Sequence, residues 1–366
     1  MSCVASPTVH GAAAVQPSAV DGPRVIVAGA TGFTGALAAH LLWRHPDFEL
    51  VAVTGRSEVG RQLQQVYPRY RVPLVFEALE VERLQGIDAA VVAYPHAAAA
   101  PTVAALRERG IRVVDLSADF RLRSLAAYEQ SYGEHPCPDL LGEAVYGLTE
   151  LHRDQIAGAG IVANPGCYPT ASLLALAPLA RAGLIADLVI DAKQGISGAG
   201  RVFDESTHLS MAGENIVPYK VAAHRHTPEI EEQLALLISS AAAAGAPAGT
   251  ANELKVQFQA HLVPLDQGEM ASCYVTTTRP VTNDELRRMY TETYQSEPFV
   301  ELLLDGPPGV LEVRETNYCR VYAAADSHTG KVIAFGAIDN LWKGTSSQAV
   351  QNLNLMFGLP ETRGLL

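Results

Sequence analysis

Apolar and polar positions in the first half of the chain follow the order typical of alternating strands and helices. The apolar run Val25–Ala28 leads into a glycine cluster, and a helical pattern then extends from Ala36 to about His45. Later runs are strand-like at Glu49–Val53, Ala89–Ala93 and Val113–Leu116, and helix-like at Ala97–Arg109. This alternation predicts a doubly wound α/β unit with a parallel sheet.

The pattern changes after about Asn164, where strand-like segments become longer. They lie at Leu188–Ala192, Leu254–Leu262 and Ala271–Thr278, with helical stretches elsewhere. Longer strands of this kind predict an α+β domain with a mostly antiparallel sheet. The strand-like Val332–Ala337 and the helical Gln348–Phe357 end the pattern, and we expect the last helix to pack against the first domain.

The length supports two domains, because 366 residues exceed the size at which a single hydrophobic core stops growing. We expect residues 24–163 together with 338–366 to form one domain and residues 164–337 the other. Residues 1–23 contain no Lys or Arg and no compact apolar run. We therefore expect a disordered extension there, and no secretory signal.

Composition narrows the classes of function. Apolar residues make up 48% of the chain and charged residues 18%, and no apolar run approaches the roughly 18 residues of a membrane span. The net charge is -12 and no basic run is present, which argues against a nucleic-acid partner. The 5 cysteines are scattered and lack a C-x-x-C pair, so we expect no disulfide framework, no zinc site and a reducing cytoplasm.

A glycine-rich turn follows the first predicted strand. It reads Gly29-Ala30-Thr31-Gly32-Phe33-Thr34-Gly35 and stands directly before the first predicted helix. Glycines allow a ligand to approach the backbone closely, and the amides at a helix N-terminus bind phosphate. A tight turn without a ligand would also use glycine. In this strand–turn–helix context the segment predicts a dinucleotide site.

The second predicted strand ends without the acidic residue that an NAD enzyme commonly uses for the ribose 2′-hydroxyl. The segment reads Thr54-Gly55-Arg56-Ser57. Arg56 and Ser57 suit a 2′-phosphate instead, which favours NADP(H), although a solvent-exposed loop arginine would look the same.

The segment Asn164-Pro165-Gly166-Cys167-Tyr168-Pro169-Thr170 precedes the apolar run 171–179. A Pro-Gly turn therefore leads into a helix that begins at the cysteine. The helix N-terminus favours a thiolate by lowering the thiol pKa, and a thiolate attacks acyl centres. A buried structural cysteine is the alternative. The turn and the helix start make Cys167 the candidate nucleophile.

Proton partners and anion contacts appear at several other positions. Tyr219 precedes His224-Arg225-His226-Thr227-Pro228-Glu229, where two histidines offer a general acid/base. A metal site would need a further ligand cluster, and no such spacing is visible. Arg121 follows a predicted strand and suits a phosphate or carboxylate. Ser197-Gly198-Ala199-Gly200-Arg201 adds backbone donors and a second guanidinium.

Together these segments resemble the N-acetyl-γ-glutamyl-phosphate reductases of the aspartate-semialdehyde dehydrogenase superfamily, over nearly everything from Arg24 to Gly358. The motifs are Gly29–Gly32, Asp115–Arg121, Asn164–Thr170, Ser197–Arg201, His224–Glu229 and Ile338–Gly344. The resemblance implies a Rossmann-type NADP-binding domain and a catalytic domain that forms a homodimer or homotetramer. It also implies reduction of an acyl phosphate through a cysteine thioester, with release of phosphate, in arginine biosynthesis.

The resemblance assigns roles to individual residues. Cys167 is the implied nucleophile and His224 the implied acid/base, with His226 as the alternative. The implied substrate contacts are Arg121, Tyr219, His226, Arg201 and Asn164. The implied cofactor contacts are Gly29, Thr31, Gly32, Phe33, Thr34, Gly35, Arg56, Ser57, Ser197, Gly198, Asn340 and Lys343.

Two positions depart from the family pattern, namely Gln194, where Ser is frequent, and the run 345–347. Other substrates remain open, because one methylene changes discrimination by only about 1–3 kcal/mol. Aminoadipyl phosphate with a blocked amine, or aspartyl phosphate, would use the same chemistry. A non-catalytic NADP-binding regulator is the alternative from another class. A short-chain reductase is disfavoured because none of the 13 tyrosines has a lysine four residues later.

Overall fold

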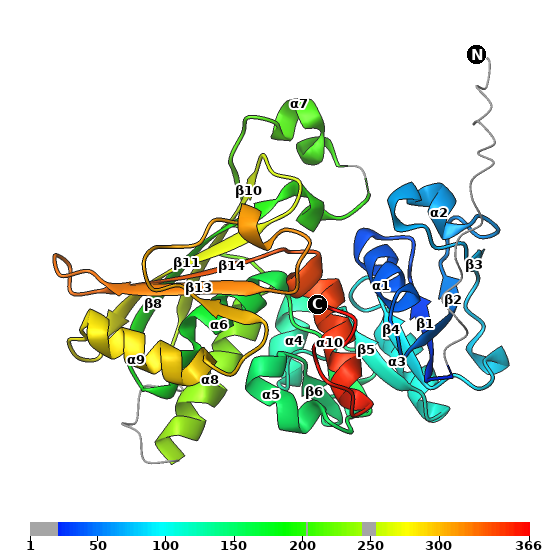
Figure 1. Ribbon diagram of the computed structural model, residues 1–366, viewed down its shortest axis with the longest axis horizontal. Coiled ribbons are helices and arrows are strands. Elements are labelled where there is room, and N and C mark those ends of the chain that lie inside the picture. Colours follow the sequence, from blue (N-terminus) through cyan, green and yellow to red (C-terminus); the bar gives the residue numbers. More distant parts are fainter. Residues whose placement is uncertain (1–20, 203, 244–253) are drawn as a thin grey trace.

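The computed structural model describes residues 21–202, 204–243 and 254–366. The expected extension 1–23 lies almost wholly outside the described residues. Figure 1 shows two sheets side by side, each with its own helices, and helix α10 (Ser347–Met356) between them.

The first sheet is entirely parallel, with the strand order β3-β2-β1-β4-β5-β7-β6. Its strands are β1 (Arg24–Ala28), β2 (Glu49–Thr54), β3 (Phe76–Glu77), β4 (Ala89–Val92), β5 (Arg112–Asp115), β6 (Ala144–Tyr146) and β7 (Ile161–Ala163). The order reverses direction at β1, as in a doubly wound sheet, so the predicted fold class is confirmed. The short strands β3, β6 and β7 were not predicted.

Helices cover both faces of this sheet. They are α1 (Phe33–Trp43), α2 (Leu63–Val66), α3 (Ala100–Glu108), α4 (Leu125–Tyr132) and α5 (Thr149–Ile156). Helix α10 packs against α1 and α5, which confirms that the last helix returns to the first sheet. The π-helix η7 (Trp342–Ser346) joins β14 of the second sheet to α10.

The second sheet has the order β12-β13-β14-β11-β8-β10-β9. Its strands are β8 (Ile185–Gly195), β9 (Val217–Tyr219), β10 (Val256–Val263), β11 (Glu269–Thr277), β12 (Val300–Leu302), β13 (Cys319–Ala325) and β14 (Val332–Ile338). Four strand pairs are antiparallel, while β8 with β10 and β12 with β13 are parallel. A mostly antiparallel second sheet is thus confirmed.

Helix α6 (Cys167–Arg181) forms the centre of the second core, together with α8 (Thr227–Ala243) and α9 (Asn283–Tyr294). The residues from Tyr168 to Ala180 are all buried, because the helix is covered on every side. It lies so close to β14 that a Cβ at Gly336 would stand 2.1 Å from the Ala171 carbonyl oxygen. This contact fixes the N-terminus of α6, and Cys167 with it, over the second sheet. A short helix, α7 (Leu209–Ala212), lies in the excursion between β8 and β9.

No helix in the described part of the chain is long and apolar enough to cross a membrane.

Candidate active site

The glycine turn after β1 has the geometry of a phosphate cradle. Gly29 adopts φ +93, and a Cβ there would lie 2.6 Å from the Ala93 carbonyl oxygen. The Gly29 and Ala30 amides donate to the Thr54 carbonyl oxygen at 3.0 and 2.9 Å. Helix α1 has no side-chain cap and no acidic residue in its first turn. Its first amides therefore face outward without a protein acceptor, as phosphate binding requires.

We predict that Gly29→Ala weakens NADPH binding at least about tenfold. The left-handed backbone costs an alanine about 1–2 kcal/mol, and the methyl group displaces the turn from Ala93. Fluorescence titration with NADPH measures the effect. The control is Gly110→Ala, which has φ +76 and open space around the Cβ. Equal losses in both variants would show that the turn is not part of the cofactor site.

A cavity of about 190 Å³ connects this turn to Cys167. It begins at Gly32, Phe33 and Thr34 and ends at the cysteine. Along its side it is lined by Gln194, Ser197, Gly198, Asn340 and Thr345, among others. Cys167 is the first residue of α6, and a Cβ on Gly344 would lie 2.8 Å from the Cys167 Cβ. A slot between the N-terminus of α1 and the sulfur of the candidate nucleophile has the position that the nicotinamide end of a dinucleotide would need.

The electrostatic surroundings of Cys167 differ from the sequence-based expectation. Burial raises the pKa of the thiol well above its usual value, and the neighbouring Glu269 carboxyl raises this pKa further. Hydrogen bonds from the Tyr168 amide and the Gln194 side chain lower the pKa, but they are the smaller effects. The prediction that the helix start depresses this pKa was therefore wrong, because desolvation and the Glu269 carboxyl outweigh the hydrogen bond from the Tyr168 amide at the helix start.

Gln194, one of the positions that depart from the family pattern, contacts the candidate nucleophile Cys167 directly. Its Nε2 donates to the Cys167 Sγ at 3.0 Å. The Gln194 side chain packs closely against Gly198. A Cβ added at Gly198 would lie 2.3 Å from the Gln194 carboxamide carbon. An amide donor stabilises a thiolate more than a thiol.

We predict that Gln194→Met slows alkylation of Cys167 by iodoacetamide about tenfold at pH 8. Loss of the donor raises the thiol pKa, since a hydrogen bond to a charged group contributes about 1.5–3 kcal/mol. Alkylation rates between pH 6 and 10 measure the shift. Gln257→Met, at an exposed position of β10, is the control. Unchanged alkylation in Gln194→Met would contradict the role of this donor.

A buried network fixes the turn before Cys167. Glu229 Oε1 accepts from the Gly166 amide at 2.9 Å and from the Tyr146 hydroxyl at 2.7 Å, while Oε2 pairs with Arg121 at 3.3 Å. Arg121 Nε also donates to the Asn164 carbonyl oxygen at 2.8 Å, and its Nη2 donates to the Leu116 carbonyl oxygen. Arg121 is 6% exposed. This guanidinium therefore supports the turn from inside the protein.

The Asn164 side chain is used in the same way. Its Nδ2 donates to the Thr345 carbonyl oxygen at 3.0 Å, and its Oδ1 accepts from Asn352 Nδ2 at 3.1 Å. Asn352 belongs to α10, and its Nδ2 also donates to the Gly147 carbonyl oxygen. The cysteine turn is thus attached to the last helix of the chain.

Both candidate histidines lie beside the cysteine turn. A Cβ on Gly166 would lie 2.6 Å from His226 Nε2, so this ring contacts the turn directly. The His224 ring packs against Tyr168, His226 and Phe258. Burial, with Lys220 and Arg225, lowers the pKa of His224 to about 4, and burial lowers the pKa of His226 well below its usual value. Both rings are therefore neutral at pH 7.

Tyr219 and Tyr168 complete the aromatic wall around the histidines, with their hydroxyls 3.0 Å apart. Nowhere in residues 21–202, 204–243 or 254–366 do three or more His, Cys, Asp or Glu side chains gather in a way that could hold a metal ion.

The remaining candidate cofactor and substrate residues differ in how far they lie from the protein surface. Arg56 and Ser57 are exposed after β2, and the Arg56 guanidinium stands over the Tyr94 ring. Arg201 donates to the Thr31 carbonyl oxygen at 3.0 Å and pairs with Glu58 at 3.1 Å, which brings it to the glycine turn and away from Arg121. Asn340 lines the cavity and donates to the Ser197 hydroxyl.

Lys343 does not line the cavity. Its Nζ is fully buried and binds Glu150 Oε1 at 2.6 Å and Gln351 Oε1 at 2.8 Å. The ion pair with Glu150 joins the π-helix to α5, and the hydrogen bond to Gln351 joins it to α10. In the structure the lysine therefore connects three helical elements.

Sequence reasoning missed the polar groups closest to the nucleophile and its turn. In the sequence, Glu229 stands out only as the last residue of the His224–Glu229 motif, and Gln194 only as a departure from the family pattern. Glu269 was not singled out at all. The one local signal for Glu269 is an acidic residue at the first position of an apolar strand.

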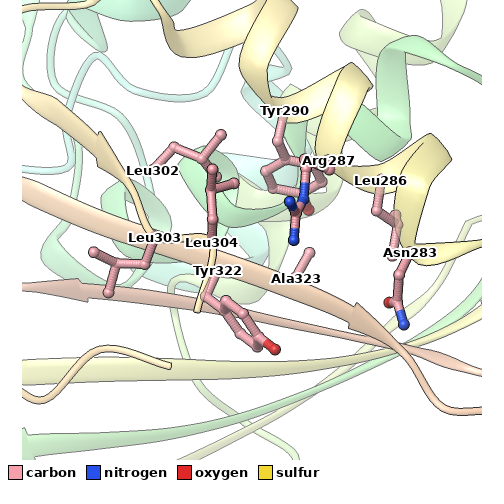
Figure 2. A pocket seen from close by; sticks show the side chains of 9 residues that line it. All are labelled: Asn283, Leu286, Arg287, Tyr290, Leu302, Leu303, Leu304, Tyr322 and Ala323. Carbon is pink, nitrogen blue, oxygen red and sulfur yellow. The ribbon is translucent and has the colours of Figure 1, made fainter. Parts of the chain in front are cut away.

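A second cavity of about 160 Å³ lies between α9 and the strands β12 and β13 (Figure 2). Figure 2 shows Arg287 and Tyr290 of α9 and Tyr322 of β13 around it. Neither Cys167 nor a histidine lines this cavity. It is therefore separate from the site described above.

Two family models match consecutive parts of the chain. The NAD binding domain of semialdehyde dehydrogenase matches residues 24–159, and the dimerisation domain of semialdehyde dehydrogenase matches residues 167–340. Solved structures agree in fold. Aspartate semialdehyde dehydrogenase II from Vibrio cholerae has a TM-score of 0.66 and 19% identity, covering 92% of this chain and 98% of that one. The Candida albicans enzyme with NADP has a TM-score of 0.64 and 17% identity, covering the same shares.

Fold and site together define a dehydrogenase of the semialdehyde dehydrogenase class. Similarity to curated relatives identifies the family within this class. The Moorella thermoacetica N-acetyl-γ-glutamyl-phosphate reductase is 45% identical over 93% of this chain and 96% of its own length. The Desulforudis audaxviator protein of the same name is 47% identical, covering 94% and 98%. The chain belongs to the N-acetyl-γ-glutamyl-phosphate reductase family.

Proposed function

We propose that this chain reduces N-acetyl-γ-glutamyl phosphate to N-acetylglutamate 5-semialdehyde and phosphate with NADPH, in arginine biosynthesis. The observation that carries the proposal is the full-length similarity to relatives of that name, at 45% and 47% identity. The cavity that ends at Cys167 supports it from the chemical side.

In the proposed reaction each side chain of the site has a separate role. The Cys167 sulfur attacks the acyl carbon and phosphate leaves, which produces a thioester on the enzyme. The amides of the first turn of α6 stabilise the oxyanion that develops on the acyl oxygen. The neutral rings of His224 and His226 carry protons between the reacting oxygen and solvent. Arg121 keeps the cysteine turn in place through Glu229.

The cofactor is bound by the first sheet in this scheme. The pyrophosphate would be held by the glycine turn, namely Gly29, Thr31, Gly32, Phe33, Thr34 and Gly35. The nicotinamide end would be held by Ser197, Gly198 and Asn340, which line the cavity toward Cys167. NADPH supplies the hydride that reduces the thioester. The exposed Arg56 and Ser57 favour the 2′-phosphate of NADPH over NADH.

The substrate is tested in the reverse direction, as NADP⁺ reduction that depends on phosphate. We expect N-acetylglutamate semialdehyde to be oxidised faster than the homologue with one more methylene, and aspartate semialdehyde to be inactive. Preference for the longer homologue would move the chain to lysine biosynthesis. Cofactor binding with no phosphate-dependent NADP⁺ reduction for any of the three would indicate a regulator. A His224→Asn enzyme with an unchanged pH profile would assign the proton transfer to His226.

We also propose that residues 24–163 with 338–366 form the cofactor domain, and that residues 164–337 form the catalytic domain and a homodimer or homotetramer interface. Support comes from the dimerisation-domain match. It comes too from the face of the second sheet away from α6, where Tyr274, Tyr322 and Phe335 are only partly covered. Light scattering during gel filtration tests the assembly. A cytoplasmic location is consistent with the free thiols of Cys137, Cys167, Cys273 and Cys319.

A further inference from the structure

Glu269 is a fully buried carboxyl that the scheme above does not use. It is the first residue of β11, where it stands opposite Gln194 of β8 and Ile338 of β14. Directly opposed residues of an antiparallel pair point to the same face, with Cβ atoms about 5 Å apart. Since Gln194 reaches the Cys167 Sγ at 3.0 Å, the Glu269 side chain lies beside the same sulfur.

This carboxyl lacks a hydrogen-bond partner in the described part of the chain. Neither of its oxygens is satisfied by a described residue, while the nearby Cys167 thiol and the carboxyl influence each other's pKa. No described arginine, lysine or histidine forms an ion pair with it. A buried unpaired carboxyl is costly for the folded state, so its retention beside a nucleophile calls for a functional reason.

The electrostatics place Glu269 in the range of a useful base. The pKa of the carboxyl is raised to about 8, chiefly by burial; the Cys167 thiol acts in the opposite direction, and the Asp339 charge contributes a smaller increase. The other titratable groups that interact with Glu269 are Tyr168, Tyr219 and Cys319. All three remain neutral at pH 8, because burial raises their pKa values above the usual ones.

The histidines are less well placed to take the thiol proton. The His224 ring packs among aromatic rings, and its Nδ1 accepts from the His226 amide at 3.2 Å. His226 contacts Gly166, the residue before the cysteine, through its Nε2. Neither ring forms a described hydrogen bond with the cysteine, whereas the Glu269 carboxyl raises the pKa of the thiol.

We propose that Glu269 is the base that accepts the Cys167 proton when the sulfur attacks the substrate. The S–H bond breaks, the proton moves to a Glu269 oxygen, and the sulfur electron pair forms the C–S bond. Phosphate leaves with the C–O electron pair and takes its proton from solvent through the histidines. After reduction the C–S bond breaks, the sulfur recovers its electron pair, and Glu269 returns the proton.

The inference rests on the thioester route of the proposed function, and it is tested with two variants. We expect Glu269→Gln to lower kcat/KM about 10²-fold or more, with little change in NADPH binding. The rise of the wild-type kcat/KM near pH 8 should disappear in this variant. We expect formate to restore part of the activity of Glu269→Ala in a saturable manner, while chloride at equal ionic strength does not. Glu285→Gln, which replaces a partly exposed carboxyl paired with Arg279, is the control.

Each outcome decides the question. Turnover and pH dependence of Glu269→Gln like those of the wild type would overturn the inference, and so would lost activity in Glu269→Ala without formate rescue. The second result would mean that the carboxyl only shapes the site. Cys167→Ser distinguishes a failure of the base assignment from a failure of the thioester route. If that variant is inactive while Glu269→Gln is active, the thioester route stands and only the base assignment fails; if Cys167→Ser is active, the route itself fails.

Discussion

Replacement of Cys167 by serine is expected to lower the rate of phosphate-dependent NADP⁺ reduction at least about 10³-fold. A hydroxyl is far less acidic than a thiol, and an oxygen ester accepts hydride less readily than a thioester. The serine would fit the same place at the start of α6, so NADPH binding should remain as in the wild type. Steady-state assays and a fluorescence titration with NADPH measure the two properties separately.

Cys137→Ser is the matched control, because this residue is also a partly exposed free cysteine and does not line the cavity. Intact-protein mass spectrometry adds a direct observation. Wild-type enzyme mixed with acyl phosphate in the absence of NADPH should gain one acyl group, and Cys167→Ser should gain none. Substantial turnover by Cys167→Ser, or an acyl group on another residue, would rule out the covalent scheme.

Glu229→Ala is expected to lower the free energy of unfolding by about 3–5 kcal/mol. The substitution leaves the Arg121 guanidinium buried without its counter-charge and leaves the Gly166 amide without an acceptor. Urea unfolding followed by circular dichroism measures the loss. Turnover should fall as well, since the same carboxylate fixes the turn that carries Cys167.

Glu232→Ala, one turn nearer the middle of α8, is the control for this substitution. Its carboxylate accepts only from the Arg123 and Ser124 amides near the surface, so we expect a loss of about 1 kcal/mol. The double variant Arg121→Leu/Glu229→Leu should regain part of the stability without regaining activity, because the Gly166 amide remains unpaired. A stability of Glu229→Ala equal to that of the wild type would show that the pair does not hold the turn.

The regular elements with a strong local pattern were predictable from the sequence. Strands β1 and β4 are continuous apolar runs because parallel strands are covered on both faces, and α10 has a clear helical period. Strands β3 and β7 have two and three residues, so they contain no full period and depend on their neighbours for pairing. Such short strands become visible only in the assembled sheet.

The site was predictable where its chemistry is local. The glycine turn and Cys167 at a helix start follow from adjacent residues. Arg201, Arg121 and Lys343 look alike as isolated cations, yet one contacts the glycine turn, one supports the cysteine turn and one is buried against Glu150. Their carboxylate partners lie 143, 108 and 193 residues away in the chain, so no local pattern distinguishes the three cations.

The sequence by itself determined the two kinds of sheet, the glycine turn after β1 and the position of Cys167 at a helix start, because these depend on residues next to one another and on the periods of helix and strand. The tertiary structure alone decided the surroundings of the Cys167 sulfur. Glu269 and Gln194 are 102 and 27 residues from Cys167 in the chain, and antiparallel pairing of β8 with β11 brings both to its sulfur. Desolvation and a neighbouring carboxyl act through space, so the direction of the thiol pKa shift could not be derived from the order of the residues.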